Sequence, residues 1–125
     1  MRVGSTSLWV PLAACLWAAG CGMSDRQLCR AFQDEDPDAR IAAVLHVNRT
    51  RNLQALPYVI ERLTDEESDV RFAAIRTLED LTGETKGYRY YDPPDQREQA
   101  LQRWRQWLLT RDLGEPTTCP ARNDG

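Results

Sequence analysis

The sequence predicts an all-α protein, a short solenoid of stacked helical hairpins that ends in a tryptophan-rich capping helix. Two observations support this prediction. A block of residues recurs at a fixed offset of 31, and apolar side chains recur at helical spacing within and between the two copies. A repeat period between about 20 and 50 residues indicates supersecondary units that stack on one another.

Length and composition limit the possibilities. The chain has 125 residues, which favours one domain, and it is 42% hydrophobic and 28% charged. The formal net charge is -3, so no excess of positive charge points to nucleic acid as a partner.

Residues 1–20 have the pattern of a secretory signal peptide. A positive start at Arg2 is followed by the uncharged run "LWVPLAACLWAAG" at 8–20. Thirteen residues are too few to span a bilayer core of roughly 30 Å as a helix. The small residues before Cys21 are typical of a cleavage site.

This ending resembles the lipobox of bacterial lipoproteins. The resemblance implies that Cys21 becomes the new N-terminus and carries acyl chains, which would anchor the protein to the cell envelope facing the periplasm. Gly22 stands where an aspartate would favour the inner membrane, so the outer membrane is preferred. Alternatives are acylation at Cys15, whose "LAAC" follows a stretch interrupted by Pro11, a plain secretory signal, or an uncleaved anchor.

Two further cysteines lie near the ends of the mature chain. Cys29 and Cys119 can form one intramolecular disulfide, and an exported compartment permits it. Such a bridge would stabilise the fold by roughly 4–5 kcal/mol in the chain-entropy model. The alternative is two free thiols. Residues 114–125 are predicted to form a flexible tail that Cys119 could tether.

The repeat defines the body of the fold, predicted at residues 21–113. "DEDPDARIAAVLHV" (34–47) aligns without a gap on "DEESDVRFAAIRTL" (65–78), which places one Ala-Ala pair on the other. Asp38 and Asp69 are predicted N-caps of the two helices, and Gly83 is predicted to end the second. Small alanine side chains would let the neighbouring helix approach closely.

Other helices complete the units. "NLQALPYVIERL" (52–63) is predicted as the second helix of the first full hairpin, and "SDRQLCRAFQ" (24–33) as the remnant of a preceding one. A last helix should begin at Pro93 or Pro94, with Asp92 as its cap. Its apolar stripe, which includes Trp104 and Trp107, would cover the last hairpin while its polar face meets water.

The chain resembles the HEAT-repeat family, in the short bacterial form also seen in phycobilin lyase-like proteins. The matching residues are the Asp-x-Asp-x-Arg start at 36–40, the Ala-Ala pairs and the closing "LTG" at 81–83. The resemblance covers about residues 28–109 and implies an α-solenoid. It also implies that four residues form a structural ladder of ion pairs and hydrogen bonds between layers: Asp34, Arg40, Asp65 and Arg71.

The connection after Gly83 contains the candidate partner-binding residues Tyr88, Arg89, Tyr90 and Tyr91. Tyrosine and arginine dominate binding hot spots, and this connection is longer than most links between helices. The alternative is that the rings pack over the tryptophan face and close the core.

The sequence gives no support for catalysis, a cofactor or a metal. His46 is the only histidine and is expected at the surface, so histidine-based zinc or nucleophile sites have little support. The acidic groups at 34–38 and 65–69 lack the glycine and the ligand spacing of a calcium loop.

The function expected from the sequence is therefore a membrane-tethered module of the bacterial envelope that binds another protein and is not an enzyme. Two alternatives remain open: a structural subunit of an envelope complex, and an enzyme or enzyme accessory akin to the bilin lyases.

Overall fold

The computed structural model describes residues 22–120. Its helices are α1 (Asp25–Phe32), α2 (Pro37–Thr50), α3 (Leu56–Glu61), α4 (Ser68–Thr82) and α5 (Pro94–Leu109), and 3-10 segments at Leu53–Ala55 and Arg62–Thr64 flank α3. This part of the chain contains no strand, which confirms the all-α prediction. The predicted signal peptide and the candidate lipidation residues Cys15 and Cys21 lie outside the described residues.

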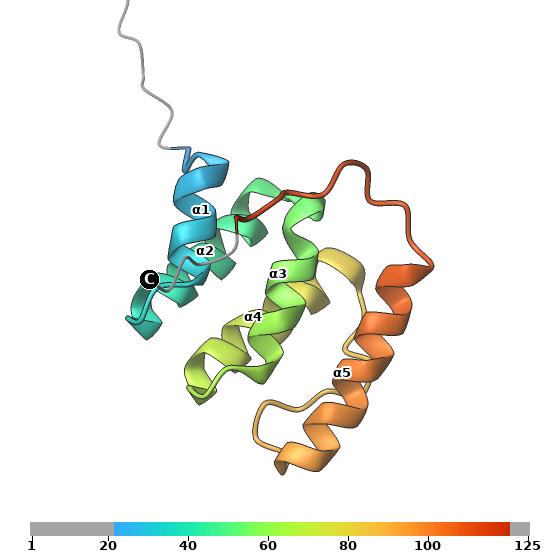
Figure 1. Cartoon of the computed structure of the whole chain (residues 1–125). Coiled ribbons are helices and arrows are strands. Elements are labelled where there is room, and N and C mark those ends of the chain that lie inside the picture. Colours follow the sequence, from blue (N-terminus) through green and yellow to red (C-terminus); the bar gives the residue numbers. More distant parts are fainter. Residues whose placement is uncertain (1–21, 121–125) are drawn as a thin grey trace, which may run out of the picture.

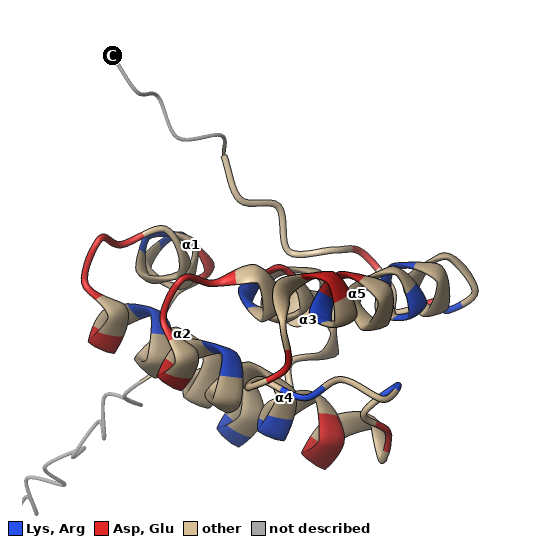
Figure 2. Cartoon of the chain, turned by 90° about the horizontal axis from the view of Figure 1, so that it is seen from below, with Lys and Arg blue, Asp and Glu red and all other residues tan. Residues whose placement is uncertain are grey.

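The helices form two layers. Figure 2 shows α1, α3 and α5 side by side in one layer and α2 and α4 in the other. The predicted repeat copies form α2 and α4, which make the most extensive contact between any two helices. Hairpins α2–α3 and α4–α5 are thus stacked, and α1 stands as the second helix of an incomplete hairpin.

The core lies between the two layers. Ala43 and Ala74, the equivalent residues of the two Ala-Ala pairs, are both fully buried. Their small side chains allow the close approach of neighbouring helices that the repeat requires. Larger side chains from both layers fill the remaining space, and burial of each contributes about 1.5–3 kcal/mol. The largest fully buried ones are Trp104, Leu28, Leu56, Ile60, Leu63, Leu78 and Leu101.

The predicted N-caps of the repeat helices are wrong by two residues. Helix α2 begins at Pro37, whose ring fixes a helical φ, so Asp36 becomes the cap and accepts a hydrogen bond from the Asp38 amide at 2.9 Å. Helix α4 has Glu67 at its N-cap, without a side-chain hydrogen bond. Asp38 and Asp69 lie instead in the first turns, where negative charge complements the helix dipole.

The later helix boundaries depend on Gly83 and on two prolines. Gly83 ends α4 with φ of 77°, a left-handed conformation that glycine adopts at little cost, as predicted. Helix α5 begins at Pro94, with Pro93 rather than Asp92 as its N-cap. Its Trp104 is fully buried, and the indole Nε1 donates to the Thr85 carbonyl at 3.1 Å. This bond ties the connection after Gly83 to α5.

A disulfide joins Cys29 of α1 to Cys119. The chain after α5 passes α3 on its way to α1 (Figure 1). Along this path the Thr117 amide donates to the Gln54 carbonyl at 3.3 Å, and the Cys119 amide donates to the Tyr58 hydroxyl at 2.7 Å. Part of the segment expected to be flexible, up to residue 120, is therefore held on the layer of three helices.

Replacing Cys29 and Cys119 by serine should lower the free energy of unfolding by about 4–5 kcal/mol, because the bridge closes a loop with a sequence separation of 90. Urea unfolding followed by circular dichroism, with and without reductant, measures this loss. Reductant should leave the double variant unaffected. Equal midpoints for the oxidised wild type and the variant would contradict the expectation.

Candidate functional site

The four ladder residues lie where the two repeats meet. The Arg40 guanidinium donates to both carboxylate oxygens of Asp65, at 2.8 and 2.9 Å, and so links α2 to the loop that precedes α4. It also donates to the backbone carbonyls of Asp34 and Glu35, at 2.8 and 3.0 Å. The Arg40 side chain therefore holds both the loop that precedes α2 and the loop that precedes α4. The hydrogen bonds to Asp65 raise the pKa of Arg40 above its usual value.

Arg71, the equivalent residue of the second repeat, bonds to the carbonyls of its own loop in the same way, but its third partner differs. It donates to the carbonyls of Asp65 and Glu66, both at 2.8 Å, and its Nε donates to the Tyr90 carbonyl at 3.1 Å. A backbone oxygen of the connection between α4 and α5 thus takes the role that a carboxylate plays for Arg40. At the other end, Asp34 accepts the Asp36 amide at 2.9 Å and shapes the first loop.

Tyr88 was predicted to contact a partner, but it is buried in the fold. Its side chain is 4% exposed, and its hydroxyl donates to the Leu63 carbonyl at 2.6 Å. Burial raises the pKa of this phenol above its ordinary value. Tyr88 therefore closes the core, which is the alternative considered for this connection, and its inclusion among the partner-binding residues is corrected.

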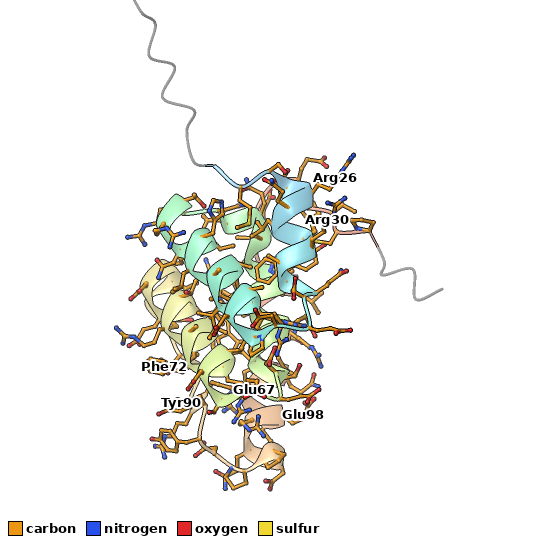
Figure 3. All side chains as sticks on the ribbon, turned by 90° about the vertical axis from the view of Figure 1, so that its left-hand side faces the viewer. Arg26, Arg30, Glu67, Phe72, Tyr90 and Glu98 are labelled. Atoms are coloured by element: carbon orange, nitrogen blue, oxygen red, sulfur yellow. A yellow bond between two sulfur atoms is a disulfide. The ribbon has the colours of Figure 1, made fainter. Side chains whose placement is uncertain are left out.

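Of the other two tyrosines, Tyr91 is exposed and Tyr90 is partly buried, and both form a cluster with a residue that the sequence analysis did not identify. The rings of Phe72 and Tyr90 lie edge to face with centroids 5.1 Å apart, and those of Tyr90 and Tyr91 do the same at 5.1 Å. Phe72 is 47% exposed and Tyr91 is 67% exposed. Figure 3 labels Phe72 and Tyr90 close together. We call these three rings the aromatic patch; Arg89, in the same connection, is also exposed.

A signal for Phe72 was present in the repeat alignment. It is equivalent to Ile41, which packs partly against the core, and a larger ring at the same position projects further outward.

His46 is 8% exposed, so the prediction of a surface histidine is wrong. It shares one hollow with the start of the described chain, which Gly22, Met23, Gln27 and Arg49 also line. Within residues 22–120, no three histidine, cysteine or acidic side chains are grouped in a way that could hold a metal ion.

A hollow lies between the two acidic loops. Its volume is about 550 Å³, and charged side chains dominate its walls, among them Arg40, Arg62 and Asp65. These three already bond to one another or to backbone, with Arg62 Nη1 3.5 Å from Asp65 and 3.0 Å from the Phe32 carbonyl. The hollow therefore lacks the apolar lining typical of a small-molecule site.

The comparison with known families agrees with this architecture. The sequence profile of HEAT repeats matches residues 26–103, which is more than half of the chain. The chain belongs to the HEAT-repeat family. No significant match is found among curated proteins or among solved structures.

HEAT repeats commonly mediate protein–protein interaction, and stacked repeats offer extended surfaces rather than enclosed pockets. The aromatic patch is an exposed apolar surface of this HEAT chain. No helix within the described part of the chain is long and apolar enough to cross a membrane.

Arg40→Met should lower the free energy of unfolding by about 3–5 kcal/mol, because the Asp65 side chain, 4% exposed, would lose its main counter-charge. Chemical denaturation measures the change. Arg76→Met is the matched control: Arg76 pairs with Glu79 at 3.0 Å, but both side chains are largely exposed, so it should cost less than about 1 kcal/mol. Similar losses in the two variants would contradict a structural role for Arg40.

Proposed function

We propose that this HEAT-repeat protein is an interaction module of the bacterial cell envelope, anchored by acyl chains on Cys21 and facing the periplasm from the outer membrane. It binds a protein partner through the aromatic patch and Arg89. It acts by surface complementarity, without catalysis and without a cofactor.

The observation that carries the binding proposal is the aromatic patch. Two of its rings are about half exposed or more, although a soluble domain gains from burying them. Aromatic and arginine side chains supply much of the energy at protein interfaces when water is excluded around them. The patch is also held in place, because Arg71 bonds the Tyr90 backbone to the fold. A fixed surface loses little conformational entropy on binding.

Two features support the envelope location. The N-terminal sequence has a positive start, a short apolar run and small residues before Cys21. The disulfide between Cys29 and Cys119 suits an exported compartment, where oxidising conditions preserve such bonds.

Metabolic labelling with palmitate tests the anchor. The wild-type protein should incorporate label and fractionate with membranes, and Cys21→Ser should lose both properties because the acylated residue is gone. Cys15→Ser provides the control and should keep the label. Label retained in the first variant and lost in the second would move the anchor to Cys15.

Replacing Phe72 and Tyr91 by alanine should weaken partner binding tenfold or more, because rings at an interface commonly contribute 2 kcal/mol or more. Crosslinking in intact cells identifies the partner, and titration of the purified pair measures the affinity. Leu109→Ala is the control, since Leu109 is 81% exposed and lies at the end of α5. Unchanged affinity in the double variant, with its helicity intact, would remove the patch from the binding site.

A further inference from the structure

The linker between Cys21 and the folded part of the chain is very short. Met23 packs partly against the core. The Ser24 amide donates to the Gln27 Oε1 at 2.9 Å, and the Gln27 amide donates to the Ser24 Oγ at 3.3 Å, which closes a capping box at the start of α1. Only the exposed Gly22 lies between Cys21 and Met23. Two residue steps reach at most about 7 Å.

Arginine and leucine side chains lie at the same end of the molecule as this point of attachment. Arg49, near the end of α2, lines the same hollow as Gly22, and Arg26 lies in the first turn of α1. Arg51 and Leu53 follow the end of α2, and Leu53 is 40% exposed. We call these four residues, Arg26, Arg49, Arg51 and Leu53, the tether corner. Three acidic residues lie at the same end: Asp25 and Glu115, which line one hollow with Asn52, and Asp80, whose backbone carbonyl accepts from Arg51.

The opposite edge of the molecule is acidic. The loops that precede α2 and α4, together with the first turns of these helices, carry eight acidic residues: Asp34, Glu35, Asp36, Asp38, Asp65, Glu66, Glu67 and Asp69. In Figure 1 these loops lie at the lower end and α1 begins at the upper end; Figure 2, seen from below, shows the red loops. Helix α2 has 14 residues and separates the two edges by about 21 Å.

We propose that the tether corner rests on the anionic phospholipid headgroups of the membrane to which the chain is anchored, with the acidic edge pointing away. The inference rests on the proposed anchor at Cys21. Because only two residue steps separate Cys21 from Met23, the acyl chains hold the start of α1 near the headgroups, which attract Arg26 and Arg49, whereas the acidic edge is repelled. Leu53 adds apolar surface at the interface.

This orientation determines what a partner can reach. Phe72 lies in the second turn of α4, close to the acidic edge, and Figure 3 shows it and Tyr90 far from Arg26. The aromatic patch is thereby held on the side of the molecule away from the bilayer. A protein in the periplasm can then approach it without displacing lipid.

The test uses the acylated, disulfide-bonded protein reconstituted in vesicles of phosphatidylethanolamine and phosphatidylglycerol. A fluorophore is placed at Leu53→Cys or, for comparison, at Glu66→Cys, and quenched by a lipid with a nitroxide on its headgroup. The label at 53 should be quenched and the label at 66 should not. Vesicles of phosphatidylcholine alone, or high salt, should reduce this difference.

The variant Arg26→Gln/Arg49→Gln should lower the occupancy of the oriented state by roughly fivefold for each arginine removed. Arg89→Gln is the control for net charge and should leave quenching unchanged. Equal quenching at 53 and 66 in protein that floats with the vesicles would overturn the orientation while the anchor stands. Protein that carries no acyl chain and does not float would overturn the anchor and this inference together.

Discussion

The ion pair between Arg40 and Asp65 holds the two repeats in register. Removing these groups from water costs several kcal/mol, and only the fork-shaped pairing and the added bonds to two carbonyls offset that cost. The guanidinium therefore fits only when the loops before α2 and α4 lie one above the other. That stacking fixes the register in which Ala43 and Ala74 are buried.

The solenoid is short, and its ends are closed by different means. At the C-terminal end the connection between α4 and α5 supplies the Tyr90 carbonyl to Arg71 and buries Tyr88. At the N-terminal end α1 has only eight residues, too few to be stable alone. The disulfide between Cys29 and Cys119 holds it by linking it to the chain that crosses α3. Covalent closure thus substitutes for the further repeats that a longer solenoid would provide.

The regular part of this fold could be predicted from sequence because it depends on spacing alone. The offset of 31 and Gly83 identify the stacked helices and the end of α4. The failures concern residues whose surroundings come from distant segments. His46 is buried beside a hollow that the first described residues also line, and the Tyr88 hydroxyl donates to a carbonyl 25 residues away. Phe72 gains its place in the patch only because Tyr90 folds back beside it.

The aromatic patch follows from the way the layer of two helices ends. In a longer solenoid, the next repeat would supply a carboxylate that pairs with Arg71, as Asp65 pairs with Arg40. Its first helix would pack beside α4. Here the connection to α5 turns back instead, so its Tyr90 backbone completes the bonding of Arg71 while the Tyr90 side chain contacts Phe72 and Tyr91. The same residue therefore ends the ladder through its carbonyl and builds the exposed surface through its ring. Loss of the Arg71 bond would release both, so the stability of this end of the molecule and the position of its exposed rings are coupled through one backbone oxygen.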